Sequence, residues 1–253
     1  MKLHVLGCSS IYPNGGQATS GYVVETAAGR LLLECGHDVV SKLIEHYSVR
    51  HLTAAVITHM HPDHYCGLFA LGNLLLAEGH LRLPLFLPPG GLNMFYEFAE
   101  RMGFDNDLLN DCFEASEYIP SRILNVTGLS IHMKRTKHPV NTFAMRFVET
   151  SSNHDFVFTS DTGWFEELFE FCQGANLLLT EATDYPLPPR SESVRRWHMT
   201  PVEAGRLIKD SDVGRAVITH YDARFSDAIL SLAQSASSHQ NVSLAGLHEE
   251  YSI

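Results

Sequence analysis

Short apolar runs alternate with longer amphipathic stretches along most of this chain. The apolar runs are rich in Val, Ile, Leu and Phe, a composition typical of strands. We predict strands over residues 3–6, 21–25, 30–33, 54–57, 85–87, 129–133, 143–148, 156–158, 177–179, 216–218 and 242–244. Because proline cannot donate to a strand ladder, Pro84 and Pro88 limit the strand at 85–87 to a short or edge position.

The longer stretches predict helices over residues 39–47, 68–77, 92–102, 164–171, 201–209 and 227–236. The helix at 201–209 has the clearest start signal. Thr200 is suited to cap it, Pro201 fits the first turn, and Glu203 completes a Thr-x-x-Glu capping box. The apolar segment at 92–99 fits either core packing or a homodimer surface, and core packing is the default.

The order of these elements predicts an α/β fold with mixed sheets. Strands 21–25 and 30–33 flank Ala27-Ala28-Gly29, as in a hairpin, whereas the later strands alternate with helices. The 253 residues contain no repeat, low-complexity segment or linker. We therefore expect one domain over residues 1–253, a length that α/β proteins often reach as a single unit.

Composition narrows the class of protein. The net charge is −11, which disfavours a large nucleic acid partner. Five cysteines without a CxxC pair predict reduced, mostly buried thiols and a cytoplasmic location. The opening residues are too short for a signal peptide, and no apolar stretch approaches the ~20 residues of a membrane span, so we expect no membrane association. The unusual count is 15 histidines.

A histidine-rich motif follows the strand predicted at 54–57. It reads Thr58-His59-Met60-His61-Pro62-Asp63-His64 and places four potential metal ligands within six positions. Imidazole nitrogens and a carboxylate together suit Zn²⁺, Mn²⁺, Fe²⁺ or Co²⁺. The alternative is a polar surface loop that is rich in histidine by chance, but composition alone seldom produces His-x-His-x-Asp-His.

Three further candidate ligands also follow predicted strands. His138 comes after 129–133, Asp161 lies in Ser-Asp-Thr-Gly after 156–158, and His220 lies in Thr-His-Tyr after 216–218. Taken alone, each of the three could be an ordinary residue, since Asp is common in turns. Loops at strand ends, however, are where α/β proteins usually place their chemistry.

In this order the motifs resemble those of the metallo-β-lactamase-fold hydrolases, and the resemblance runs from Leu3 to the end of the chain. It implies a four-layer αββα sandwich with two mixed β-sheets flanked by helices. It also implies a site with two divalent metal ions, zinc foremost and manganese as an alternative. His59, His61 and His138 would bind one ion, Asp63, His64 and His220 the other, and Asp161 would bridge them.

A finer resemblance is to the ribonuclease Z and cyclic-phosphodiesterase branch. The segment Arg196-Trp197-His198-Met199-Thr200 precedes a helix and the late Thr-His, and the resemblance makes His198 catalytic. Leu177-Leu178-Leu179-Thr180-Glu181 supplies a carboxylate, Glu181, to orient His198. The tRNA-processing members carry a long arm between the lone His and the bridging Asp. Here 22 residues separate His138 from Asp161, as in small bacterial members without that arm.

These features predict a hydrolase for a small or cyclic phosphodiester. Two metals ~3.5–4 Å apart would share a hydroxide that attacks phosphorus, with Asp63 contacting it and His198 protonating the leaving oxygen. Three alternatives stay open: an acyl, thioester or lactone hydrolase, a tRNA 3′-processing endoribonuclease, and a non-catalytic metal-binding regulator. A flavodiiron-like role needs a flavin domain for which this chain has no room. The remaining histidines are expected to be structural or surface residues: His4, His37, His46, His51, His80, His132, His154, His239 and His248.

Overall fold

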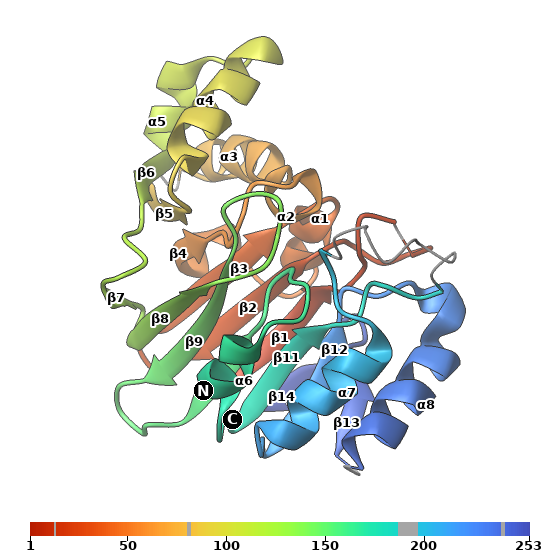
Figure 1. The fold of residues 1–253 in the computed structure, drawn as a ribbon. Coiled ribbons are helices and arrows are strands. Elements are labelled where there is room, and N and C mark those ends of the chain that lie inside the picture. The colour runs from red at the N-terminus through yellow and green to blue at the C-terminus, as the bar shows by residue number, and fades with distance from the viewer. Residues whose placement is uncertain (13, 80–81, 187–196, 239–240) are drawn as a thin grey trace.

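The computed structural model describes residues 1–12, 14–79, 82–186, 197–238 and 241–253 (Figure 1). Two seven-stranded sheets form its centre. The first has the order β14 (Glu250–Ser252), β1 (Lys2–Gly7), β2 (Gly21–Thr26), β3 (Gly29–Cys35), β4 (Leu52–Val56), β5 (Leu83–Leu87), β6 (Phe113–Glu117). The second has the order β13 (Val242–Leu244), β12 (Arg215–Thr219), β11 (Leu177–Glu181), β10 (Asp155–Phe158), β9 (Phe143–Glu149), β8 (Leu129–Arg135), β7 (Leu124–Val126).

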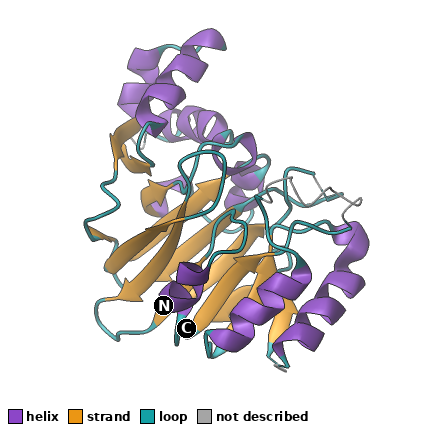
Figure 2. Cartoon of the chain, viewed as in Figure 1, coloured by secondary structure: helices purple, strands orange, loops and turns teal. Residues whose placement is uncertain are grey.

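Helices cover the outer faces of both sheets (Figure 2). They are α1 (Val39–Ile44), α2 (Pro62–Tyr65), α3 (Leu68–Ala77), α4 (Gly91–Arg101), α5 (Asn106–Cys112), α6 (Glu166–Cys172), α7 (Pro201–Asp210) and α8 (Ser226–Ser237). Short 3₁₀ helices occur at η1 (Val49–His51) and η2 (Ala223–Phe225). The predicted αββα sandwich with two mixed sheets is therefore confirmed. Within the described ranges, no helix is both long and apolar enough to cross a membrane.

Strand alternation explains the layers. In β3, Leu31 and Leu33 face the second sheet, where they join a core with Phe147 and Phe156. Leu32, between them, belongs to a separate core formed with the helices outside the first sheet. Successive side chains of a strand point to opposite faces, so a strand that is apolar at every position must be buried on both sides. The Leu31-Leu32-Leu33 run meets that requirement.

The predicted elements are confirmed with shifts of a few residues at their ends. The hairpin of β2 and β3 is antiparallel, and Thr200 and Glu203 form the predicted capping box of α7. The prediction missed β6, β7, β14, α2 and α5, which are short or polar. The edge alternative for residues 85–87 is wrong, because β5 pairs with both β4 and β6. Pro84 is tolerated there since the pairing with β4 begins at Leu85.

Candidate metal centre

The loops that carry the candidate ligands meet because of strand direction. β10, β11 and β12 are parallel, and β8 runs the same way because it reaches β10 through two antiparallel pairings. Their carboxyl ends therefore lie at one edge of the second sheet. The isolated bridge between Ser9 and Tyr221 ties the loop after β1 in the first sheet to this edge. Segments that are far apart in sequence thus converge on one place.

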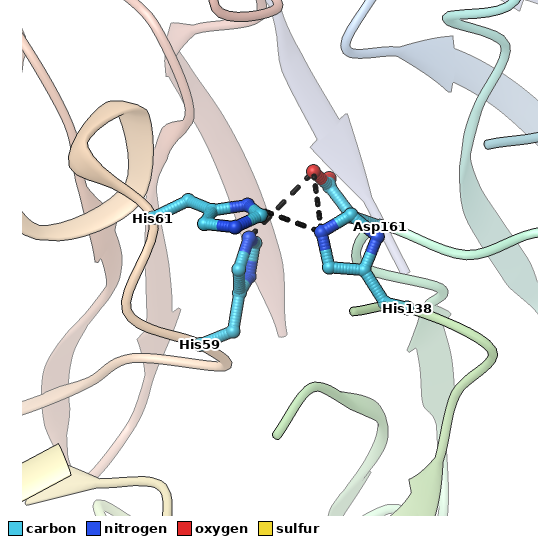
Figure 3. A group of neighbouring side chains, drawn as sticks. All are labelled: His59, His61, His138 and Asp161. Atoms are coloured by element: carbon cyan, nitrogen blue, oxygen red, sulfur yellow. Dashed lines mark hydrogen bonds and ion pairs between the residues drawn. The ribbon is translucent and has the colours of Figure 1, made fainter. Parts of the chain in front are cut away.

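One group of ligand atoms comes from His59, His61, His138 and Asp161, and these atoms all lie within 4.8 Å of one another. Figure 3 shows the four side chains pointing toward one another, with His59 and His61 on one loop and His138 and Asp161 on others. His138 Nε2 lies 3.1 Å from His61 Nδ1, and Asp161 Oδ2 lies 3.6 Å from His59 Nε2. The structure therefore brings together the residues predicted to hold the first ion.

A second group, Asp63, His64 and His220, lies on the other side of Asp161. His220 Nε2 lies 3.2 Å from Asp63 Oδ2 and 3.3 Å from His64 Nε2. Asp161 Oδ1 lies 3.5 Å from both His64 Nε2 and His220 Nε2, whereas its Oδ2 faces the first group. One carboxylate thus presents one oxygen to each group, which is the arrangement predicted for a bridging ligand.

The spacing of these atoms fits metal coordination. Two ligands bound tetrahedrally to zinc at 2.0–2.1 Å lie roughly 3.3 Å apart. The shortest separations between ligand atoms, 3.1 to 3.6 Å, are close to that value, and the distance from His138 Nε2 to Asp161 Oδ2 is longer, at 3.9 Å. Two buried atoms of the set, His59 Nε2 and Asp161 Oδ1, have no hydrogen-bond partner among the described residues. Because an unpaired buried carboxylate oxygen is costly, a cation is the partner that these atoms lack.

Outer contacts fix the orientation of the imidazoles. His138 Nδ1 donates to the carbonyl oxygen of Trp197 at 3.0 Å, which leaves Nε2 for a metal. His220 Nδ1 lies 2.7 Å from the Thr183 hydroxyl, which itself donates to the His220 carbonyl. Such contacts set the tautomer of a metal-binding histidine. Sequence reasoning missed both partners, since neither a backbone carbonyl nor a lone threonine carries a recognisable pattern.

Glu34 is the main residue that the sequence analysis missed. It is the penultimate residue of β3, is fully buried, and accepts a hydrogen bond from the Thr58 backbone N–H at 3.1 Å. Its Oε2 lies 3.7 Å from His64 Nδ1, the nitrogen that faces away from the metal cluster. Burial raises the pKa of Glu34. A carboxylate directly after Leu31-Leu32-Leu33 was the available signal, because a charge that ends a buried strand needs a partner.

The charges of the cluster are strongly coupled. Burial raises the pKa of Asp63, but His64 and His220 outweigh it and lower the pKa to about 2. Burial lowers the pKa of His138 to about 4, and it holds the pKa of His59 well below its usual range. Asp63 is therefore ionised and His59 and His138 are neutral near pH 7, the protonation states in which they bind metal. Burial lowers the pKa of His64, but Asp161 and Asp63 outweigh it and raise that pKa well above its usual range, so a metal must displace a proton from His64.

Backbone strain concentrates at the same place. Glu34, Ser160 and His220 have φ values of 60°, 52° and 53°, in the left-handed region that non-glycine residues seldom adopt. Gly36 is required for close packing, because a Cβ there would lie 2.0 Å from the carbonyl oxygen of Asp63. Strain of this kind persists where surrounding structure fixes a functional geometry.

His198 and Glu181 lie beside the two groups. His198 Nδ1 lies 3.0 Å from Glu181 Oε1, and the His198 ring is 5.1 Å from that of His138 and 5.8 Å from that of His220. Glu181 is fully buried and also accepts the Thr162 backbone N–H. Burial lowers the pKa of His198, but Glu181 more than offsets this and the pKa rises to about 10. The predicted pair is thus in contact, within reach of the metal cluster.

The geometry admits a second role for His198. It forms a potential ligand group with Asp161 and His220. Its Nδ1 is engaged by Glu181, so Nε2 alone remains for a metal or for proton transfer. The His198 side chain is 24% exposed, against 1% for His138 and 3% for His220. His61, a predicted ligand, is also half-buried, so the exposure of His198 is compatible with contact with a substrate and with metal coordination.

Comparison with known proteins decides the family. A family model described as a beta-lactamase superfamily domain matches residues 29–221. The chain belongs to this superfamily. It is a metallo-hydrolase of the metallo-β-lactamase fold, related to YhfI and to ribonuclease Z, so the predicted family is confirmed.

The relatives span most of the chain. YhfI of Bacillus subtilis, named a "probable metallo-hydrolase", is 28% identical over 225 residues, covering 87% of this chain and 86% of the relative. A YhfI crystal structure matches with a TM-score of 0.85 at 25% identity, covering 99% and 98%. Mitochondrial ribonuclease Z 2 of Schizosaccharomyces pombe is 27% identical over 239 residues, covering 89% of this chain and 34% of that protein. A crystal structure of a diphosphatase from the PhnP family matches with a TM-score of 0.78 at 14% identity, covering 100% and 97%, which shows a shared fold alone.

Removing one ligand from each group tests the assignment of the metals. His61→Ala and His220→Ala should each lose about one ion per chain relative to the wild type, and the double variant should lose about two, as expected for a dinuclear site. Elemental analysis after loading with Zn²⁺ or Mn²⁺ and removal of free metal gives the counts. His132→Ala, which removes an exposed histidine of β8, is the control and should lose none. Equal metal content in the wild type, the two single variants and the double variant would contradict the assignment.

Proposed function

We propose that this metallo-hydrolase is a phosphodiesterase that acts on a small or cyclic phosphodiester. The observation that carries the proposal is the contact between His198 and Glu181 beside the metal cluster. Cleavage of a phosphodiester expels an alkoxide, a poor leaving group that needs a proton. A histidine held by a buried carboxylate next to the ligands is suited to deliver it.

His198 and Glu181 have different roles in the proposed reaction. When bound, the two metal ions would supply a Lewis acid for the phosphoryl oxygens and activate a water near neutral pH. His198 carries the proton at Nε2, since Nδ1 points at Glu181. Glu181 is a positioning residue: Oε1 lies 3.0 Å and Oε2 3.2 Å from His198 Nδ1, and the Thr162 and Thr183 amides hold both oxygens in place.

The segment between His138 and Asp161 favours a small substrate. β9 and β10 take up half of this interval, and a short turn joins them. The segment therefore lies within the sheet and is not available to grip a long RNA. The net charge of −11 adds long-range repulsion of polyanions. Both observations favour a small phosphodiester over a tRNA, although ribonuclease Z is among the relatives.

The N-terminus of α7 gives little support to a phosphate substrate. The start of α7 follows His198 closely, and helix N-termini attract anions through their free N–H groups. Here the Thr200 N–H donates to Glu203 Oε2, and the Glu203 N–H donates to the Thr200 hydroxyl. The capping box therefore uses N–H groups that would otherwise face a ligand. The arginines that precede His198 in sequence, Arg190, Arg195 and Arg196, lie outside the described residues.

Acyl, thioester or lactone hydrolysis is the second candidate, because the same metal pair would polarise a carbonyl. A panel under one set of conditions separates the two. The protein, loaded with Zn²⁺ or Mn²⁺, is assayed against cyclic nucleotides, a dinucleotide, bis(p-nitrophenyl) phosphate, a thioester and a lactone. We expect kcat/KM for at least one phosphodiester to exceed that for every acyl substrate by ~10²-fold or more, since discrimination follows kcat/KM. A higher kcat/KM for the thioester or lactone would contradict the proposal and favour acyl hydrolysis.

A further inference from the structure

A second cluster of histidines lies outside the metal centre. His4 is on β1, His46 follows α1, and His248 precedes β14, so the three come from distant parts of the sequence. Ligand-type nitrogens of the three all lie within 4.8 Å of one another. The cluster shares no residue with the dinuclear groups. It lies at the outer face of the first sheet, where α1 packs, whereas the dinuclear centre is formed by loops beyond the strand ends.

The hydrogen bonds of the cluster leave particular nitrogens free. His4 is 3% exposed, and its Nδ1 lies 2.8 Å from the Tyr47 hydroxyl. His248 Nε2 lies 2.9 Å from Glu45 Oε2. The remaining nitrogens, His4 Nε2 and His248 Nδ1, are buried and have no hydrogen-bond partner among the described residues. Because buried polar atoms are nearly always paired, two unpaired imidazole nitrogens in one cluster point to a ligand.

We propose that His4, His46 and His248 form a second metal site, specific for a first-row cation such as Zn²⁺, Co²⁺, Ni²⁺ or Cu²⁺. Three imidazoles suit these ions, whereas Mg²⁺ and Ca²⁺ prefer oxygen ligands. A metal-binding histidine typically donates its other N–H to a carboxylate or another oxygen. Glu45 on His248 and Tyr47 on His4 provide those contacts.

Packing alone accounts less well for the cluster. The ring centroids are 5.0 Å apart for His4 and His46, 5.7 Å for His4 and His248, and 4.2 Å for His46 and His248, with tilts of 56° to 76°. Aromatic stacking would explain these distances but would not explain why the two inner nitrogens lack donors or acceptors. His248 also has a φ of 64°, which non-glycine residues seldom adopt. The backbone is therefore held in an uncommon conformation to aim this side chain.

The exposure of the ligands indicates how the site would work. His46 is exposed and the His248 side chain is 25% exposed, whereas His4 is buried. A cation would thus enter from solvent and keep water in its remaining position. Bound there, it would link β1, the end of α1 and the segment before β14. A cation that binds only the folded chain stabilises it by mass action, so melting temperature gives a readout that does not depend on catalysis.

The test uses the full chain with one ligand removed from each group of the dinuclear centre. In the His61→Ala/His220→Ala background we expect one Co²⁺ or Cu²⁺ per chain to remain, with nitrogen hyperfine splitting in the Cu²⁺ EPR spectrum. Adding His46→Ala, a change at an exposed position, should weaken this binding at least ~100-fold, as loss of a ligand exceeds the 10–100-fold cost of an outer contact. Adding His132→Ala should change nothing. Glu45→Gln should weaken binding about 10-fold or more.

A second comparison keeps the dinuclear centre intact. Wild-type protein should take up one more Zn²⁺ than His46→Ala, with equal hydrolase activity and a melting temperature that rises with Zn²⁺ only in the wild type. His248→Asn, which tolerates the positive φ, should behave like His46→Ala. Equal Zn²⁺ uptake by wild type, His46→Ala and His248→Asn would overturn the proposal. So would absence of the nitrogen hyperfine signal in the double-variant background.

Discussion

Asp63→Ala is expected to lower phosphodiesterase turnover by more than about 10³-fold, a larger loss than that caused by a single missing oxyanion donor. The Asp63 carboxylate is buried, and Oδ2 lies 3.2 Å from His220 Nε2 and 3.6 Å from His64 Nε2. The variant should lose its second metal ion, and with it the chemistry that this ion supplies.

The change at Asp63 should spare the fold. The residue contributes no core packing, and the α2 turn is fixed by Pro62 and by the backbone bond from His64 to His61. Circular dichroism and thermal melting check the fold, and elemental analysis checks the metal. Asp227→Ala, which removes an exposed acid from α8, is the matched control and should retain full turnover. A folded Asp63→Ala protein with near-wild-type turnover would place the active site elsewhere.

Local pattern was sufficient for most of the fold. The apolar runs Leu31-Leu32-Leu33 and Leu177-Leu178-Leu179 are buried, and their short length between turn signals indicates strands before any contact is known. β6, with the sequence Phe-Glu-Ala-Ser-Glu, lacks such a pattern because it is the edge strand and faces solvent at most positions. It forms a strand because it pairs with β5. This pairing is a tertiary contact, which the sequence of the five residues does not indicate.

The candidate metal ligands could be predicted from the sequence, whereas the residues that orient them could not. His59, His61, Asp63 and His64 occupy six positions after β4 of the first sheet, and His138, Asp161 and His220 each follow a strand of the second sheet. Strand order places the last three at one edge, and the packing of the two sheets brings the first four to the same place. Glu34, Thr183 and the Trp197 carbonyl act on those ligands through contacts across 30 to 59 positions of sequence. The cluster of His4, His46 and His248 could not be predicted for the same reason, since its members come from distant parts of the chain.

His198→Ala is expected to lower turnover of an unactivated phosphodiester at least ~100-fold, within the ~10²–10⁴-fold range for a general acid. Metal content should be unchanged, which separates proton donation from the ligand role that its position beside Asp161 and His220 also allows. Glu181→Gln should cause a smaller loss of kcat at unaltered metal content. Its amide preserves the shape of the contact at 3.0 Å but not the charge that orients a protonated imidazole.

The leaving group decides whether this loss reflects proton donation. A nitrophenolate departs without a proton, whereas an alkoxide needs one, so the effect of His198→Ala should shrink sharply for bis(p-nitrophenyl) phosphate. A histidine that only binds the phosphoryl group would lose the same factor on both substrates. Steady-state kcat for a cyclic nucleotide and for the activated diester, in wild type and variant at matched metal content, gives the comparison. If both substrates tolerate His198→Ala equally well, the acid role is wrong and acyl hydrolysis becomes the better reading of this site.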